Sequence, residues 1–416
     1  MGIIALRKDR LTLQMARIRV LFLLAVVCPS FFASPQQGSR PPADTPSTSS
    51  DILHLMPAGT VGDQACRPCH QEKFESFSQT RHHFTSQLPN LHTIAGKFTT
   101  GQNTMTTFNP KVSFRMDAKG GNLYETAILG KPGHKRTRSE QIGIVVGSGR
   151  KGQTYLYWKD DRLYELPVSY WTELNSWVNS PGYVDGSADF DRAITPRCLE
   201  CHATFFQALD PTPSDNHFSK SNFVLGISCE RCHGPGGEHI QHHQAVAGSS
   251  GKEKPMAPVA MERERQVEAC AQCHGGVGDE VAPAFSFSPG QHLADYVRLQ
   301  PPDPFAHIDV HGNQVALLEK SRCFQASPNM TCTTCHNVHA VEKSAASYSD
   351  RCITCHQPEK CPAFAKLGRQ TTTNCIDCHM PVQASNSLVL DVDDTRVKAR
   401  VRNHWIRVYP APSGLH

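Results

Sequence analysis

The sequence predicts a mainly α-helical fold with much irregular structure, interrupted by one small β-rich insertion. Three observations support this prediction. Hydrophobic residues make up only 39% of the 416 residues, while glycine and proline account for 29 each, so a conventional aliphatic core is under-supplied. The 17 cysteines and 22 histidines recur in one short pattern. Residues 101–195 contain no cysteine and alternate aromatic with polar side chains, as half-buried strands do, and Thr154–Trp158 and Leu163–Leu166 flank two aspartates as in a hairpin.

The short pattern is Cys-x-x-Cys-His, and it occurs seven times. Two thiols one helical turn apart reach the two vinyl groups of one porphyrin, and the following histidine is then held beneath the iron. Zinc ribbons use Cys-x-x-Cys without requiring a histidine after each pair, and a thioredoxin-type dithiol occurs once. The sequence therefore predicts seven covalently attached haem c groups, each with its iron.

The pattern names the residues that attach each haem and hold its iron. The attaching cysteines are Cys66, Cys69, Cys198, Cys201, Cys229, Cys232, Cys270, Cys273, Cys332, Cys335, Cys352, Cys355, Cys375 and Cys378. The proximal iron ligands are His70, His202, His233, His274, His336, His356 and His379. Six of the seven motifs crowd into residues 198–379, which leaves too few residues to build a core beside each haem. The fold is thus expected to wrap short helices and loops around stacked haems.

The N-terminus has the features of a secretory signal. Basic residues precede an apolar stretch at residues 20–27, and small residues follow, with cleavage expected after Ala33. An uncleaved N-terminal anchor is the alternative, although the apolar run is short for a membrane span. We therefore expect export to the periplasm without a stable transmembrane span, with membrane association through an uncleaved N-terminus as the alternative.

Residues 147–152 fit a Gly-x-Gly-x-x-Gly pattern, but no helix is expected after them, so a hairpin turn is a better interpretation than a dinucleotide site.

Composition divides the chain into six segments. The expected segments are a signal peptide at 1–33, a flexible tether at 34–60, a haem 1 segment at 61–100, a β-rich insertion at 101–195, a hexahaem region at 196–380 and a C-terminal tail at 381–416, which supplies a distal ligand and contains a strand-like run at 401–408.

A second axial imidazole for each iron must come from the fifteen remaining histidines. His239 and His339 follow their own motifs so closely that the chain there is pinned on the proximal side, and either one can serve only a neighbouring haem. His82 lies twelve residues after a proximal histidine, and His404 lies in a tail with no other evident purpose. For each of them, a solvated or propionate-bonding side chain is the alternative.

The long gap between the fourth and fifth motifs holds less certain candidates, His292, His307 and His311. The haem of Cys270–His274 borders this gap and has the least certain distal ligand. Two other residues outside the motifs, Cys323 and Cys361, are expected to pair as a disulfide in an exported chain, with two free thiols as the alternative.

The motifs and their flanks resemble the cytochrome c-552/4 type of multihaem cytochrome c, within the broad group of nitrite reductases and hydroxylamine oxidoreductases. The resemblance covers most of residues 61–410. It is carried by Cys66–His70 with Gln79–His82, Leu166–Tyr170 with Trp177 and Ser180–Tyr183, Ile227–His239, Cys332–His339, Cys375–Pro381 and Asn403–Ile406.

This resemblance implies stacked haems with two histidine ligands each, and it implies that His82, His239, His339 and His404 are distal ligands. The pentahaem nitrite reductases use a Cys-x-x-Cys-Lys haem as their open catalytic site, and this sequence has no such motif. Tetratricopeptide repeats, which some relatives carry, are not seen in it either.

Two functions are consistent with the sequence. The leading hypothesis is an exported heptahaem electron carrier with no catalytic residues, whose partners are redox proteins or a membrane quinol-oxidising complex. The alternative is an oxidoreductase that acts on a small nitrogen or sulfur oxyanion at one five-coordinate haem. The formal net charge is +4, and no basic patch with interleaved aromatic residues is present, so a nucleic-acid partner is not expected.

Overall fold

The computed structural model describes the chain in seven stretches. They are residues 50–210, 212, 215–245, 261–300, 308–341, 344–392 and 395–410. The expected signal peptide, most of the expected tether and His307 lie outside the described residues. The chain divides into two units, residues 1–41 and 42–416, and every described residue belongs to the second unit.

The prediction of a mainly α-helical fold is wrong, because the structure is 27% helical and 28% strand. Its helices are short, since a motif needs only about one turn to bring its two cysteines together. They are α1 (Ser50–Leu53), η1 (Asp63–Ala65), α2 (Arg67–Phe77), α3 (Pro196–Glu200), α4 (Cys229–His233), α5 (Gly237–Ala245), α6 (Arg263–His274), η2 (Leu293–Asp295), α7 (Gln314–Glu319), α8 (Arg322–Ala326), η3 (Cys332–Thr334), α9 (Ala345–Ile353), η4 (Pro358–Lys360), α10 (Phe364–Leu367), α11 (Gln370–Thr373) and α12 (Cys375–His379). None of the described helices has the length and apolar composition that a membrane span needs.

Strands extend well beyond the predicted insertion. They are β1 (Ser86–Gln87), β2 (Thr104–Thr106), β3 (Val112–Lys119), β4 (Asn122–Leu129), β5 (Arg136–Gln141), β6 (Ile144–Val146), β7 (Gly152–Lys159), β8 (Arg162–Glu165), β9 (Val168–Trp171), β10 (Ser176–Asn179), β11 (Ala203–Ala208), β12 (Phe218–Leu225), β13 (Gly278–Glu280), β14 (Val297–Leu299), β15 (Val382–Val392) and β16 (Thr395–Arg402). Every pair of these named strands is antiparallel, as expected for short hairpin connections.

The strands of the predicted insertion form two sheets. Strands β2 to β5 make a four-stranded meander, and β1, β6, β7, β9 and β10 follow one another in a second sheet, with β8 also paired to β7. Strands β6 and β7 pair across residues 147–151, so the glycine-rich segment is a hairpin turn, as predicted. The predicted hairpin of β7 and β8 is also confirmed, and its turn contains Asp160 at φ 55°.

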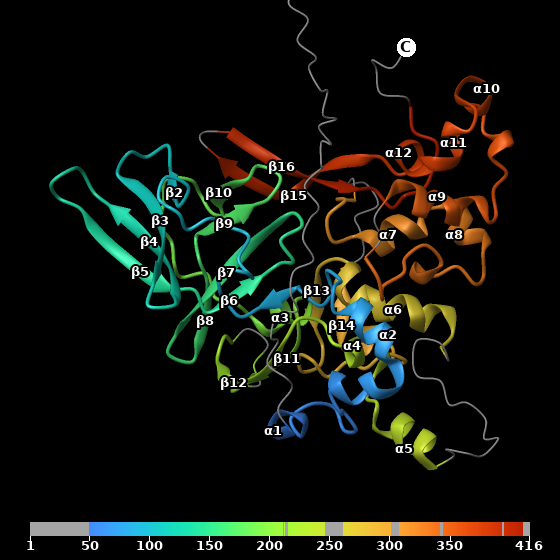
Figure 1. The fold of residues 1–416 in the computed structure, drawn as a ribbon, viewed down its shortest axis with the longest axis horizontal. Coiled ribbons are helices and arrows are strands. Elements are labelled where there is room, and N and C mark those ends of the chain that lie inside the picture. Colours follow the sequence, from blue (N-terminus) through green and yellow to red (C-terminus); the bar gives the residue numbers. More distant parts are fainter. Residues whose placement is uncertain are drawn as a thin grey trace, which may run out of the picture. The chain divides into compact units, whose positions relative to one another are not determined.

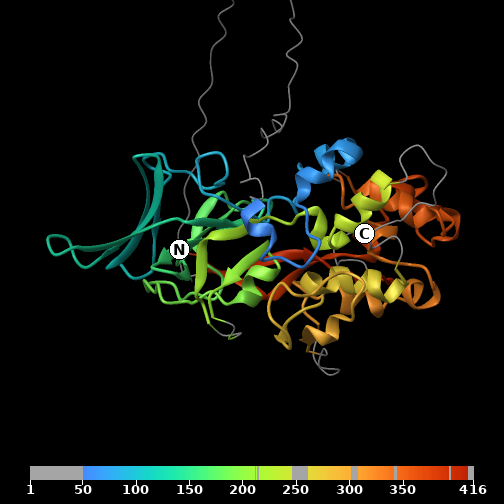
Figure 2. The same cartoon turned by 90° about the horizontal axis from the view of Figure 1, so that it is seen from below.

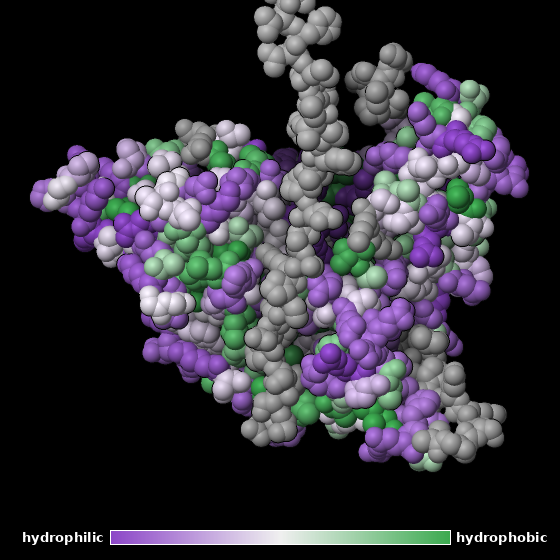
Figure 3. Space-filling model, viewed as in Figure 1, coloured by the Kyte–Doolittle hydropathy of each residue, from purple (hydrophilic) through white to green (hydrophobic). Residues whose placement is uncertain are grey.

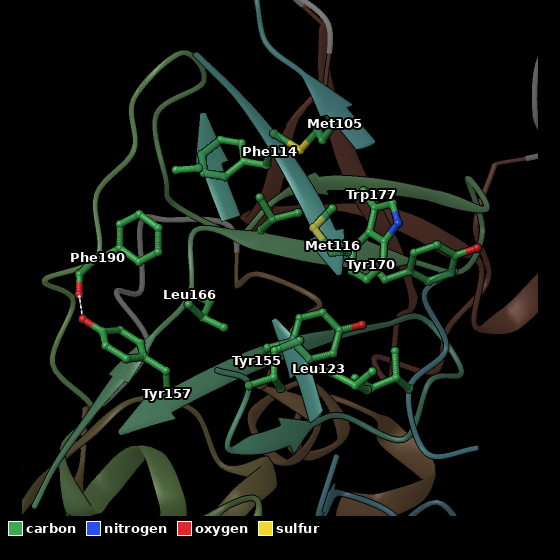
Figure 4. Packing of buried hydrophobic residues seen from close by; sticks show 14 of the residues in the cluster. Met105, Phe114, Met116, Leu123, Tyr155, Tyr157, Leu166, Tyr170, Trp177 and Phe190 are labelled. Carbon is green, nitrogen blue, oxygen red and sulfur yellow. Dashed lines mark hydrogen bonds between the residues drawn. The ribbon is translucent and has the colours of Figure 1, made fainter. Parts of the chain in front are cut away.

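Successive side chains of strand β7 point to opposite sides of the sheet, and both sides are covered by hydrophobic clusters. Tyr155 and Tyr157 join Phe114 and Phe190 in one hydrophobic cluster, while Leu156 joins a second cluster on the other side. The hydroxyl of Tyr157 donates a 2.8 Å hydrogen bond to the carbonyl of Phe190, as Figure 4 shows. The insertion therefore has a protein core of its own.

Most helices that follow the insertion lie together, apart from its sheets. Figure 1 shows α6 to α12 on one side of the described chain and β2 to β10 on the other, and Figure 2 shows the same separation from below. Helix α2 comes early in the sequence but lies among the later helices. On the face drawn in Figure 3, hydrophobic residues form small separate groups among hydrophilic ones.

The C-terminal tail contains a hairpin that the sequence analysis missed. Strands β15 and β16 pair, and β15 is tied to β10 by a 3.0 Å hydrogen bond from the Asn179 side chain to the Asp391 carbonyl. The strand-like run expected at 401–408 overlaps β16 only at its start. The alternation of basic and apolar residues from Arg396 to Arg402 is a strand signal that starts earlier.

Candidate haem sites

Each motif lies on or next to a short helix, which sets its two cysteines one turn apart. The carriers are α2, α3, α4, α6, η3, α9 and α12. Within α2, His70 departs from helical geometry, at φ −119° and ψ 39°. The motif histidines therefore stand at or just beyond the ends of regular turns, where their rings can project away from the helix.

Four motif histidines lie opposite a histidine from a distant part of the chain. The distances between ring centroids are 6.1 Å for His70–His239, 6.2 Å for His82–His274, 5.7 Å for His233–His339 and 6.2 Å for His336–His404. The angle between ring planes is 20–26° in three of these pairs and 85° in His82–His274. All four partners are residues that the sequence analysis named as distal candidates.

The pair of His233 and His339 shows how the rings meet. Their Nε2 atoms are 3.5 Å apart while the centroids are 5.7 Å apart, so the rings meet nitrogen to nitrogen and not face to face. An imidazole nitrogen binds a transition metal at about 2.0 Å, so two nitrogens on opposite sides of one ion are about 4 Å apart. The arrangement therefore fits an iron held between the two histidines.

The second motif has a less direct partner. The pKa of His202 is lowered to about 4, first by burial and then by the nearby imidazoles of His311 and His274. Since His274 already lies opposite His82, the remaining neighbour of His202 is His311. No described residue bonds the buried Nδ1 atom of His202. The structure thus brings His311 into the surroundings of the second motif.

Two distal candidates, His82 and His404, are held as neutral rings, the form that binds a metal. Burial lowers the pKa of His82 to about 4, with a further contribution from His274. The pKa of His404 is also lowered to about 4 by burial, then by His336, and its Nδ1 lies 3.1 Å from the Arg402 carbonyl. A ring nitrogen bonded to a backbone carbonyl leaves the other nitrogen free to act as the ligand.

The last two motifs differ from the four motifs whose histidines lie opposite a second ring. Within the described residues, no second imidazole is in ring contact with His356 or His379. Nδ1 of His379 lies 3.0 Å from the Arg407 carbonyl, which would orient its Nε2 as a ligand. His292 is exposed beside η2 and is not brought to a motif histidine by any ring contact of the described chain.

The loop that carries His82 is fastened to two other motifs. The His82 carbonyl accepts a 3.0 Å hydrogen bond from the Ile227 amide, just before the third motif. The carbonyl of His202 accepts bonds from the hydroxyls of Thr85 and Ser86, at 2.9 and 2.7 Å. The chain passes closely enough for glycine to be required at Gly226, where an added Cβ would lie 2.2 Å from the His83 carbonyl oxygen.

Two acidic residues join the first and third motifs. Asp63 accepts a 2.8 Å bond from the Cys229 amide, and the buried Glu230 accepts bonds from the amides of Val61 and Gly62 at 2.9 and 2.8 Å. Burial raises the pKa of Asp63 more than its hydrogen bonds with Cys229 lower it. Sequence reasoning missed both residues, although Glu230 stands between the two cysteines of a motif, a position that requires no particular side chain for haem attachment.

Cysteines from different motifs lie within hydrogen-bonding reach of one another. The pairs are Cys66–Cys229, Cys201–Cys273, Cys270–Cys332 and Cys352–Cys375. Longer-range electrostatic interaction relates Cys232 to Cys270 and Cys273, and Cys335 to Cys352. Neighbouring cysteines thus join motif 1 to motif 3, motif 2 to motif 4, motif 4 to motif 5 and motif 6 to motif 7.

The expected disulfide between Cys323 and Cys361 is not formed, and both residues are free thiols in the structure. Cys323 lies near Cys352 of the sixth motif, which it contacts electrostatically. The two cysteines bracket the fifth and sixth motifs in sequence, but this spacing does not bring their side chains together.

Comparison with known proteins supports the same kind of site. Residues 172–234, which contain the second and third motifs, match the family described as cytochrome c554 and c-prime. A 97-residue stretch is 29% identical to the C-type polyheme cytochrome OmcC of Geobacter sulfurreducens, and it covers 23% of this chain and 11% of that protein. No solved structure matches the chain significantly.

These matches cover only part of the chain, and the family match contains the motifs of His202 and His233. A c-type cytochrome holds its haem through thioethers and an axial histidine, and this chain repeats that set of residues. Together, the observations support a multihaem electron-carrying c-type cytochrome with covalently attached haem c and its iron.

Proposed function

We propose that the protein is an exported, periplasmic heptahaem cytochrome of the cytochrome c-552/4 type that carries electrons along stacked haems. The observation that carries this proposal is the set of four motif histidines that lie opposite a second imidazole at 5.7–6.2 Å. Two imidazoles keep iron low-spin in both oxidation states, so little rearrangement accompanies each electron.

The neighbouring cysteines of different motifs support the path. Each thioether sulfur stands at the edge of its porphyrin, so contacting cysteines of two motifs bring two porphyrin edges together. The contact between Cys66 and Cys229 joins the first and third motifs, and that between Cys352 and Cys375 joins the last two. Electrons would therefore pass readily between the haems of motifs that are joined in this way.

The partners follow from the same chemistry. A carrier exchanges single electrons with redox proteins or with a membrane complex that oxidises quinol, and it needs no substrate pocket of its own.

Mass spectrometry of the purified protein tests the haem count, because thioether-bound haem survives denaturation. We expect a mass increase of seven haems, and fewer would contradict the reading of the motifs.

Protein-film voltammetry tests the transport itself. We expect reversible waves that together account for seven electrons, unchanged by nitrite, hydroxylamine or sulfite. A catalytic current with one of these compounds would replace the carrier by the second candidate function.

That second candidate is an oxidoreductase that acts on a small nitrogen or sulfur oxyanion at a haem with an open position. It is favoured by one observation, namely that no described imidazole is in ring contact with His356 or His379. His274, whose haem the sequence had left with the least certain distal ligand, lies opposite His82. An open haem is therefore to be sought at the last two motifs.

Carbon monoxide separates the two candidates, because it binds ferrous haem only where the sixth position is vacant or weakly held. The carrier predicts no binding by the reduced native protein. Binding by one or two haems in seven, together with turnover of an oxyanion, would support the enzyme.

A further inference from the structure

The carboxylate of Asp309 holds together two segments that are far apart in the sequence. Its Oδ1 accepts hydrogen bonds from the hydroxyls of Ser385 and Ser387, at 2.7 and 3.0 Å. Its Oδ2 accepts a bond from the backbone amide of Asn386. Three consecutive residues of β15 thus donate to one charged acceptor, and bonds of this kind are stronger than those between neutral groups.

The receiving segment is a bulge in the C-terminal hairpin. Strand pairing stops at Ala384 opposite Arg400 and resumes at Val389 opposite Lys398, so residues 385–388 leave the ladder. Ser385 is completely buried there, and its hydroxyl oxygen also accepts bonds from the amides of residues 387 and 388. A bulge frees donors that the ladder would otherwise use, and here they converge on Asp309.

The same carboxylate oxygen also holds the loop of His311. Oδ1 of Asp309 accepts a 2.9 Å bond from the His311 amide. The side chain of Asn313 donates to the carbonyls of both Asp309 and His311, at 3.1 Å each. The backbone around His311 is therefore closed into a tight turn, and this turn is fixed to the hairpin by Asp309.

We propose that Asp309 is a positioning residue that fixes the imidazole of His311 beside His202 by fastening its loop to the bulge of β15. This inference rests on the proposed function, in which His202 and His311 hold the same iron. An imidazole must be placed within a fraction of an ångström to hold an iron against thermal motion, and supporting hydrogen bonds outside the ligand shell provide such placement.

The same hairpin also leads directly to a second ligand. His404 follows the end of β16 by two residues, and its carbonyl accepts a 3.2 Å bond from the hydroxyl of Ser321. That hydroxyl in turn accepts a 2.8 Å bond from the Ile406 amide. The hairpin thus supports the imidazoles proposed for the second and fifth haems, the first through Asp309 and the second through chain continuity.

The test compares Asp309→Ala with His311→Ala in the full-length, haem-loaded protein. The readouts are the fraction of high-spin haem in the oxidised protein and carbon monoxide binding after reduction. We expect His311→Ala to convert one haem in seven to the high-spin form. We expect Asp309→Ala to convert much of the same haem, and Asp309→Asn to convert less, because it keeps one acceptor oxygen. Haem content should remain at seven in each variant.

The exposed carboxylate of Asp295 offers a matched control, and Asp295→Ala should leave the spectrum unchanged. If Asp309→Ala does not fold, the double variant Ser385→Ala with Ser387→Ala removes two of the donors from the other side. The positioning role would be overturned if His311→Ala changes the spectrum while Asp309→Ala does not. If Asp309→Ala does not fold, the double variant is compared with His311→Ala in the same way. An unchanged spectrum in His311→Ala would instead overturn the assignment of His311 as a ligand, on which the inference rests.

Discussion

The strand-rich region, residues 104–225, and the motif-rich region, residues 226–410, fill their interiors differently. Of the described side chains, the twelve largest that are fully buried all lie in the strand-rich region, between Phe114 and Phe218. The motif-rich region contributes smaller clusters, such as the one of Ala271, Phe287, Leu293 and Val297. It nevertheless holds five of the seven motifs.

This difference indicates which part of the molecule depends on haem. A polypeptide of ordinary composition stabilises itself by burying apolar side chains, at about 25 cal/mol per Å² removed from water. The strand-rich region does this with aromatic and methionine side chains on both sides of β7. The motif-rich region has too few such residues, so porphyrin rings must supply its missing apolar volume.

The largest expected effect comes from removing a haem of the motif-rich region. In the double variant Cys332→Ala with Cys335→Ala, hydrogen exchange should become fast over much of residues 308–410. Exchange in strands β2 to β10 should stay slow, because the hydrophobic clusters around β7 are built from protein side chains. Mass spectrometry of peptides after exchange measures both regions in one sample.

A cysteine outside the motifs provides the control for this experiment. Cys323→Ala removes a thiol but no haem, and it should leave exchange unchanged in both regions. Retained protection of residues 308–410 in the double variant would show that protein side chains alone fill this region.

The converse experiment weakens the strand-rich region. Phe114 is completely buried, and Phe114→Ala should reduce the free energy of unfolding of this region by about 3–5 kcal/mol through lost burial and the cavity left behind. The haem spectrum should not change. Phe108→Ala is the control, since 58% of that side chain is exposed and its removal should cost little. A shift in haem spin state would show that the two regions share one core.

A smaller and more local effect is expected from the distal candidates. His404→Ala should turn one low-spin haem into a high-spin haem without loss of covalent haem, as seen in the electronic spectrum. The same result is expected, at a different haem each time, for His82→Ala, His239→Ala and His339→Ala. His292→Ala should have no effect, because this histidine is exposed. An unchanged spectrum for His404→Ala would make it a surface residue.

How far the fold could be read from the sequence follows the same division. The hairpin of β7 and β8 was predictable because two short runs rich in aromatic and aliphatic residues, Tyr155 to Trp158 and Leu163 to Leu166, stand on either side of a polar turn. The helical content was overestimated because strands were expected only in the insertion, whereas the pairs β11–β12, β13–β14 and β15–β16 also lie between and after the motifs. The hairpin of β15 and β16 was missed although basic and apolar side chains alternate from Arg396 to Arg402.

The sites were predictable to a different degree. The motif spacing gives the attaching residues directly, and short chain connections already implied that His239 and His339 must serve other haems. Which haem each one serves depends on distant segments meeting, and no local pattern encodes that. Asp309 and Glu230 were missed for a similar reason, because their partners lie far away in the sequence.

The smallest predicted effect concerns Glu125 in the strand-rich region. Its carboxyl is fully buried, one oxygen accepts a 3.2 Å bond from the Val168 amide and the other has no partner in the described chain. Burial raises the pKa of Glu125 well above its ordinary value, and Glu165 nearby adds to this. A raised pKa means that the folded state binds the proton more tightly than the unfolded state does.

The stability that protonated Glu125 contributes is therefore complete below the unfolded pKa of about 4.3 and is lost as the pH rises through the folded value. Glu125→Gln should remove this dependence and stabilise the region near neutral pH, by less than Phe114→Ala destabilises it. Urea unfolding at about pH 5 and about pH 8 measures the change. Equal pH dependence in the variant and the native protein would place the titrating group elsewhere.

The central claim is that histidines from distant parts of the chain share irons with the motif histidines, and Mössbauer spectroscopy tests it most directly. In the oxidised native protein enriched in iron-57, each iron contributes equally to the spectrum, so the areas of the low-spin and high-spin signals give the number of irons of each kind. Four ring pairs and the neighbourhood of His202 and His311 predict at least five low-spin ferric irons in seven. A spectrum in which most of the seven irons are high-spin would contradict the account.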